Sequence, residues 1–191
     1  MKRTAIDRDR ELLARIRAGD QTACDDCIRE HSPGVYRLAL RLMKNTAEAE
    51  DVVQEAFLSA FKGIDQFDGR SGIQTWLYRI AYNTALMRLR RRPESLPVDE
   101  LIEPEEGAAV PRALIDRCSL AQQELEKAEI RAEIRRAIAE LPPRMRAVLV
   151  MRDLDELSTE ATAQALGVSV EAVKTRLHRA RQLLKDRLRG L

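Results

Sequence analysis

Basic side chains gather near the end of the chain, where they could bind the phosphates and base edges of duplex DNA. The segment 174–189 holds seven Lys or Arg residues and a single acid. Ala163, Gly167 and Val173 precede it at the spacing of a helix-turn-helix, and Ser169 is a good N-cap for the second helix. The combination predicts a DNA-binding helix-turn-helix. A helical bundle with a solvated basic face is the alternative.

Aromatic residues form a second group, suited to binding unstacked bases. Six of the seven lie between positions 57 and 82, and the arginine-rich run 88–92 follows at once. Rings offer stacking faces, and cations hold the nucleic-acid backbone. Core packing is the alternative. It is favoured for Phe57 and Phe61, four residues apart, and stays open for Trp76, Tyr78 and Tyr82.

Acidic residues precede these aromatics on one predicted helix. They are Glu48, Glu50, Asp51 and Glu55, with Gln54 among them. The cluster could be a solvated face or could dock a basic partner helix.

Cys24, Cys27 and His31 lie near one helical face and could bind a metal ion, with Cys118 a distant fourth ligand. A redox switch between Cys24 and Cys27 is another hypothesis. We favour buried structural thiols, because cysteine is among the most buried residue types. Three cysteines do not suggest a disulfide framework.

The elements that must position these groups are predicted to be helices. Apolar spacing gives breaks at Gly19–Asp20, at Ser32–Pro33, where a new helix restarts, and at Asn45–Thr46. Thr46 is the expected N-cap of the acidic helix.

A loop over 67–72 should precede a long helix that Thr75 caps and that runs from Trp76 to about Arg92. On this helix Arg79, Asn83 and Arg90 share a polar stripe. Further helices are expected from about Cys118 to Leu141 and over 145–154, ahead of the helix-turn-helix.

A segment rich in proline and acids divides the chain. Residues 93–111 contain four prolines and six acids but no Lys or Arg, which favours extended chain over a long helix. We therefore predict an all-α protein of two small helical domains. The domains are 8–92 and 118–191, joined by a flexible acidic linker over 93–117.

Bulk composition agrees with this class of protein. The 191 residues are 45% hydrophobic and 34% charged, yet the net charge is only +2, which excludes a histone-like polycation. The sequence contains no transmembrane-length apolar run, and its first residues show no signal-peptide pattern. We expect a cytoplasmic protein without membrane insertion.

Together these motifs resemble an extracytoplasmic-function sigma factor of RNA polymerase, from about Arg8 to Leu188. The stretches that carry the resemblance are AEAEDVVQEAFLSAF (47–61), FDGRSGIQTWLYRIAYNTALMRLRRR (67–92), LPPRMRAVLVMRDLDELS (141–158) and LSTEATAQALGVSVEAVKTRLHRARQLLKDRL (157–188).

The resemblance implies a protein that binds core RNA polymerase and directs promoter-specific transcription initiation. It implies contacts with the β′ clamp helices and the β flap, with promoter DNA, and with an anti-sigma factor. It implies no catalytic residue, cofactor or metal, so an enzyme is not expected.

The resemblance also implies a role for individual residues. Contacts with the β′ clamp helices fall on Glu50, Asp51, Gln54 and Glu55. Contacts with the minus-ten element fall on Phe67, Arg70, Ile73, Trp76, Arg79, Asn83, Arg88, Arg90 and Arg91. Contacts with the minus-thirty-five element fall on Ser169, Lys174, Thr175, Arg176, Arg179 and Arg181.

Two other classes of function are alternatives to a sigma factor. A stand-alone helix-turn-helix regulator would bind duplex DNA without polymerase, but it leaves the Trp76 helix and the acidic linker unexplained. An enzyme with a Cys24–Cys27 dithiol lacks the expected βαβ pattern.

Overall fold

The computed structural model describes residues 5–69, 71–91 and 124–189, and these residues form helices and no strand. The prediction of an all-α protein is confirmed. None of the helices in this described part has the length and apolar character needed to cross a membrane. The acidic segment 93–117 and Cys118 lie outside the described residues.

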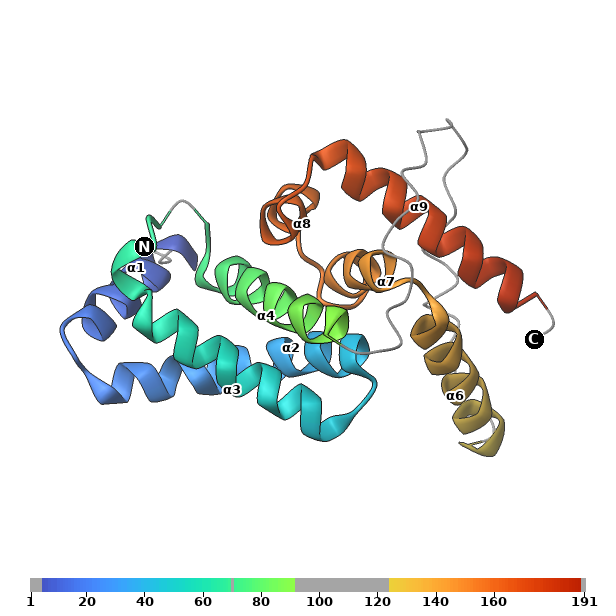
Figure 1. Ribbon diagram of the computed structural model, residues 1–191, viewed down its shortest axis with the longest axis horizontal. Coiled ribbons are helices and arrows are strands. Elements are labelled where there is room, and N and C mark those ends of the chain that lie inside the picture. Colours follow the sequence, from blue (N-terminus) through green and yellow to red (C-terminus); the bar gives the residue numbers. More distant parts are fainter. Residues whose placement is uncertain (1–4, 70, 92–123, 190–191) are drawn as a thin grey trace.

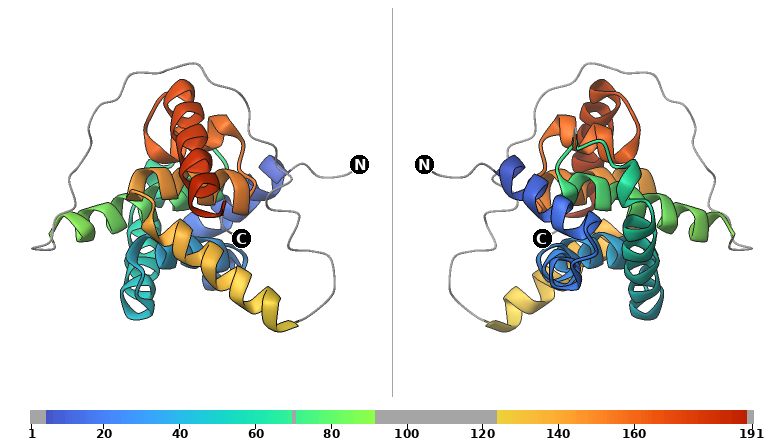
Figure 2. Two further views of the ribbon diagram at one scale, coloured as in Figure 1. Left: turned by 90° about the vertical axis from the view of Figure 1, so that its right-hand side faces the viewer. Right: turned by 90° about the vertical axis from the view of Figure 1, so that its left-hand side faces the viewer.

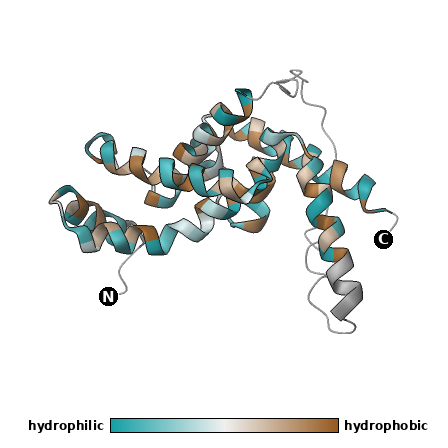
Figure 3. Ribbon diagram, turned by 60° about the horizontal axis from the view of Figure 1, so that its bottom comes forward, coloured by the Kyte–Doolittle hydropathy of each residue, from teal (hydrophilic) through white to brown (hydrophobic). Residues whose placement is uncertain are grey.

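The N-terminal domain is a helical bundle (Figure 1). Its helices are α1 (Ala5–Arg17), α2 (Gln21–Met43), α3 (Thr46–Lys62) and α4 (Ile73–Arg90), with a short 3-10 helix, η1 (Ile64–Gln66), before α4. Each long helix is amphipathic, with hydrophobic and hydrophilic residues alternating along the ribbons in Figure 3. The buried residues include Leu38, Val52 and Leu77, one from each of α2, α3 and α4.

The C-terminal domain contains the predicted helix-turn-helix. It consists of α6 (Glu124–Glu140), α7 (Pro143–Leu149), a π-helical segment η3 (Val150–Leu154), α8 (Thr159–Leu166) and α9 (Val170–Arg187). Gly167 ends α8 in the left-handed conformation, with φ of 66°. The Ser169 side chain accepts a hydrogen bond from the Ala172 amide, 3.1 Å away, and caps α9. Ala163 and Val173 are buried between the helices, so the predicted motif is confirmed.

The predicted break at Ser32–Pro33 is wrong, because α2 runs unbroken through both residues. A proline inside a helix removes one backbone hydrogen bond. The same face of α2 buries Cys27 before the proline and Val35 and Leu38 after it. Packing along this continuous apolar face outweighs the lost bond.

Two helix starts also differ from the prediction. The N-cap of α3 is Asn45, one residue before Thr46, and its side chain accepts a hydrogen bond from the Glu48 amide. Thr75 does not cap α4, since it lies inside that helix and is buried. The α4 start is stabilised from α1, because the Asp9 carboxylate accepts a hydrogen bond from the Ile73 amide at 2.9 Å.

The two domains pack against each other (Figure 1 and Figure 2). Helix α4 lies against α8, and α2 lies against α7. Arg146 of α7 is buried at this boundary and donates hydrogen bonds to the Arg41 and Leu42 carbonyl oxygens of α2, at 2.8 and 3.3 Å. The described helices therefore form one contiguous body, although the sequence divides them into two domains.

Candidate nucleic-acid interface

A small pocket lies at the start of α4, built around two stacked rings. The Phe67 and Trp76 rings have centroids 4.6 Å apart and planes inclined by 28°. The pocket has a volume of about 150 Å³. Pockets that enclose drug-sized ligands measure roughly 300–1,000 Å³, so this one suits a single planar group.

The loop that carries Phe67 is fixed by α1. Arg17 donates hydrogen bonds to the Ile64 and Phe67 carbonyl oxygens, at 3.1 and 2.6 Å. Phe67 is buried, whereas Trp76 is half-buried and open to the pocket. The geometry can hold a flat ring beside an indole.

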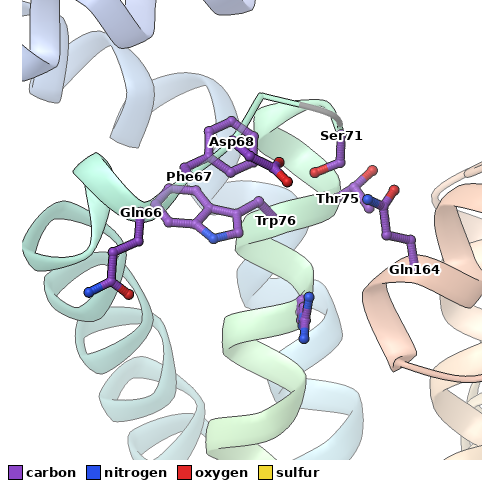
Figure 4. A pocket seen from close by; sticks show the side chains of 8 residues that line it. Gln66, Phe67, Asp68, Ser71, Thr75, Trp76 and Gln164 are labelled. Atoms are coloured by element: carbon purple, nitrogen blue, oxygen red, sulfur yellow. The ribbon is translucent and has the colours of Figure 1, made fainter.

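Several lining residues were not predicted from the sequence (Figure 4). Gln66 is the last residue of η1, Asp68 and Ser71 lie in the loop that follows, and Thr75 comes from the first turn of α4. Asp68, Ser71 and Thr75 lie between Phe67 and Trp76 in the sequence and Gln66 directly precedes Phe67, which was the available signal. Gln164 of α8 also lines the pocket and projects toward Thr75, a placement that only the packing of the two domains creates.

The other predicted minus-ten residues divide into exposed and buried groups. Arg79, which lines the pocket, is exposed, as are Asn83, Arg90 and Arg91 farther along α4. Ile73 is only 1% exposed and belongs to the core, so its side chain is not presented to a ligand. Arg70 and Arg92 lie outside the described residues.

The remaining aromatic residues belong to the hydrophobic core. Tyr78 and Tyr82 are buried, so of the two interpretations that the sequence left open, core packing is the correct one for both. The core position expected for Phe57 and Phe61 is confirmed, since Phe57 is buried and the Phe61 ring lies 6.0 Å from it.

Arg88 links the predicted DNA-binding helix to the acidic cluster on α3. Its guanidinium lies 3.0 Å from an Asp51 oxygen and 3.0 Å from a Glu55 oxygen. The hydrogen bonds that Arg88 donates to Glu55, with a further one to Asp51, raise the Arg88 pKa. Both carboxylates remain substantially exposed, and so do Glu50 and Gln54. Arg88 therefore fixes one edge of an acidic surface, a role that the sequence did not predict.

The basic face of α9 begins at the cap of the helix-turn-helix. Ser169 and Lys174 are exposed, and Thr175, Arg176 and Arg179 are half-exposed. Their position on the second helix of the motif matches that of residues that read the major groove.

Arg181 differs from these residues because its side chain turns toward η3 of its own domain. Its guanidinium donates two hydrogen bonds to Asp153, at 2.9 and 2.6 Å. The Asp153 side chain is 7% exposed, so the pair is largely removed from solvent.

Within the described ranges, Cys24, Cys27 and His31 of α2 are not brought together as a group of metal ligands. No group of three His, Cys, Asp or Glu side chains in the described ranges could hold a metal ion. Cys27 is buried, and that burial raises its thiol pKa to about 12, whereas Cys24 is half-buried. Burial also lowers the pKa of His31. The buried structural thiol is therefore confirmed for Cys27.

Family models match both domains. The model for sigma-70 region 2 matches residues 27–93, and the model for sigma-70 region 4 matches residues 131–184. The first match contains the acidic surface and every residue that lines the Phe67–Trp76 pocket except Gln164, and the second contains the helix-turn-helix.

Similar proteins extend this likeness over almost the full chain. The extracytoplasmic-function (ECF) RNA polymerase sigma factor SigW of Bacillus subtilis is 34% identical over 182 residues, covering 95% of this chain and 97% of that protein. The ECF sigma-E factor of Escherichia coli is 35% identical over 188 residues, covering 96% and 95%.

A solved structure has the same fold. It is that of CnrH in complex with the cytosolic domain of CnrY, with a TM-score of 0.67 and 26% identity, covering 95% of this chain and 97% of CnrH. The stand-alone regulator is not favoured, because a sigma-70 region 2 accompanies the helix-turn-helix. The chain belongs to the extracytoplasmic-function family of RNA polymerase sigma factors.

Proposed function

We propose that this sigma factor reads a promoter with two surfaces and binds core RNA polymerase with a third. Residues 8–92 would bind polymerase and the minus-ten element, and residues 118–191 would bind the minus-thirty-five element. The segment 93–117 would connect them. The protein would act in the cytoplasm with the polymerase.

The Phe67–Trp76 pocket is the observation that carries this proposal. A single unstacked base fits a small site with an aromatic wall, and base–aromatic stacking contributes about 1–3 kcal/mol per base. Arg79 and Asn83 would then contact the minus-ten strand, with Arg90 and Arg91 on its phosphates. Phe67 and Ile73 would position the loop and the helix from the core.

Polymerase binding falls on the exposed acidic surface of α3. Glu50 and Gln54 are presented directly, and Arg88 orients Asp51 and Glu55 beside them. A cluster of carboxylates complements a basic partner helix and accelerates its association. We propose the β′ clamp helices as that partner, with the β flap contacting the C-terminal domain.

Minus-thirty-five recognition falls on the N-terminal half of α9. Lys174, Thr175, Arg176 and Arg179 would reach the major groove from a helix that Ser169 caps. Arg181 would support this surface through Asp153 rather than contact bases. An anti-sigma factor is a further expected partner, and CnrH was solved as a complex with the cytosolic domain of CnrY.

Transcription in vitro tests the proposal directly. Purified core polymerase is incubated with a library of promoter fragments, with and without the protein. We expect promoter-specific transcripts only when the protein is added. Duplex binding by the protein alone, with no transcript, would support the stand-alone regulator instead.

Variants separate the three surfaces. Glu50→Lys should abolish co-purification with core polymerase, whereas Asp25→Lys, an exposed acid on α2, should leave it unchanged. Arg79→Ala should reduce permanganate reactivity of the opened minus-ten thymines. Lys174→Ala should weaken promoter binding. It should also reduce the slope of log affinity against log salt concentration by about one. Equal behaviour of Glu50→Lys and Asp25→Lys would contradict the assignment of the acidic surface.

A further inference from the structure

A carboxylate at the domain boundary receives hydrogen bonds from two helices of the opposite domain. Asp155, at the end of η3, accepts a bond from the Tyr78 hydroxyl of α4 at 2.9 Å. Its other oxygen accepts from Arg37 of α2, with N–O distances of 2.9 and 2.7 Å. The Asp155 side chain is 0% exposed. We call these three residues the Asp155 latch.

The surrounding backbone is shaped to build this contact. Asp155 closes the π-helical turn, with its amide donating to the Val150 carbonyl at 2.9 Å. Glu156 follows in the left-handed conformation, with φ of 55°, which is uncommon for a residue other than glycine. Such backbone strain persists only where the surrounding structure holds it.

Gly34 lets the Tyr78 hydroxyl reach the latch. A Cβ atom at Gly34 would lie 2.6 Å from the Tyr78 oxygen, closer than Cβ atoms approach other heavy atoms in proteins. A buried carboxylate is stable only when it is paired and hydrogen-bonded. The two domains supply complementary halves of such a site, which distinguishes it from incidental surface contact.

The C-terminal domain reaches the Phe67–Trp76 pocket in this arrangement. Helix α4 packs against α8, and Gln164 of α8 forms part of the pocket lining (Figure 4). Gln164 therefore narrows the pocket from one side, and a base would enter more freely once α8 moves away.

The spacing of promoter elements does not fit this arrangement. The minus-ten and minus-thirty-five elements are about 25 base pairs apart, or roughly 85 Å along duplex DNA at about 3.4 Å per pair. The helices assigned to the two domains are in contact here. Residues 92–123 could span at most roughly 110 Å at about 3.3–3.6 Å per residue, enough to permit separation.

We propose that the Asp155 latch holds this chain in a closed form that cannot read both promoter elements at once, and that polymerase and promoter binding select an open form. The consequence for DNA binding rests on the proposed function, whereas the latch itself does not. When a closed form holds about nine-tenths of the molecules, the apparent affinity for a ligand of the open form falls about tenfold.

Trp76, the single tryptophan, is a built-in reporter of the latch. The test compares the full-length protein with Tyr78→Phe, Arg37→Gln and Asp155→Asn. Arg29→Gln, which breaks only an exposed ion pair with Asp26 on α2, is the matched control. Circular dichroism verifies that each variant is helical. Tyr78→Phe removes the hydroxyl but retains the buried ring. This variant therefore still tests the latch if Asp155→Asn misfolds.

We expect each folded latch variant to show stronger acrylamide quenching of Trp76, emission at longer wavelength and a larger radius of gyration by X-ray scattering. Arg29→Gln should match the parent protein. Folded Tyr78→Phe and Arg37→Gln with parental quenching and radius would overturn the latch.

A fluorescent single-stranded oligonucleotide with the minus-ten sequence of an active promoter extends the test. We expect about tenfold tighter binding by the latch variants than by the parent. Opening of the variants without oligonucleotide binding or transcription would refute the proposed function and leave the latch intact. Unchanged oligonucleotide affinity with active transcription would refute coverage of the pocket by α8.

Discussion

Substitution of Arg146 by methionine should be among the most destabilising single changes in this protein. Arg146 is 2% exposed and its guanidinium lies between two helix ends. It donates to the Arg41 and Leu42 carbonyls of α2 and to the Ala139 and Leu141 carbonyls at the end of α6. Carbonyls at helix C-termini lack helical partners and carry partial negative charge, so one cation satisfies several of them.

The magnitude follows from these contacts. A hydrogen bond to a charged group contributes about 1.5–3 kcal/mol, and each buried carbonyl left unsatisfied costs about 1–3 kcal/mol. Burial lowers the Arg146 pKa to about 10, so the side chain stays charged at neutral pH. Methionine keeps the apolar stem but leaves the carbonyls unsatisfied. We expect a loss of about 3–5 kcal/mol in the free energy of unfolding, a large part of the roughly 5–15 kcal/mol typical of a domain.

Urea unfolding followed by circular dichroism at 222 nm measures this loss. Arg146→Lys, which retains the charge but not the planar fork, should fall between the parent and Arg146→Met. Arg136→Gln, an exposed arginine on α6, should leave stability within about 0.5 kcal/mol of the parent. A loss below about 1 kcal/mol for Arg146→Met would refute the view that this guanidinium joins the helix ends.

Three further predictions concern His31, Cys27 and Lys44. The lowered pKa of His31 means that the unfolded chain binds a proton more readily, so stability should be full above about pH 6.5 and fall as the pH drops below it. The difference in urea midpoint between about pH 7.5 and 5.5 should shrink in His31→Gln and not in His178→Gln. Cys27→Ser should leave the number of thiols that react rapidly with Ellman's reagent unchanged, because the native Cys27 thiol is buried and its pKa is about 12; a loss of one rapid thiol would contradict this. Lys44 ends α2 with φ of 60°, so Lys44→Gly should raise the free energy of unfolding by about 1 kcal/mol, and a lower urea midpoint would refute the argument from backbone strain.

Local signals predicted the helices and the helix-turn-helix. Periodic apolar residues specify which face of each helix is buried, and this holds for Val52 on α3 and Leu77 on α4. Gly167 and Ser169 act within a few residues of their own positions, so their roles follow from the sequence. The clustering of Trp76 with Phe67 was likewise visible, because the two residues are only nine positions apart in the sequence and the fold brings their rings together.

Tertiary structure alone decided which distant groups meet. Asp9 stabilises the start of α4 from 64 positions away, and the Asp155 carboxylate meets Tyr78 across the domain boundary. The sequence predicts that Arg88 binds DNA, yet in the structure its guanidinium pairs with Asp51 and Glu55. Periodicity and capping report interactions within about one helical turn. Partners far apart in sequence are chosen by packing and by the need to satisfy buried charges, which no local pattern encodes.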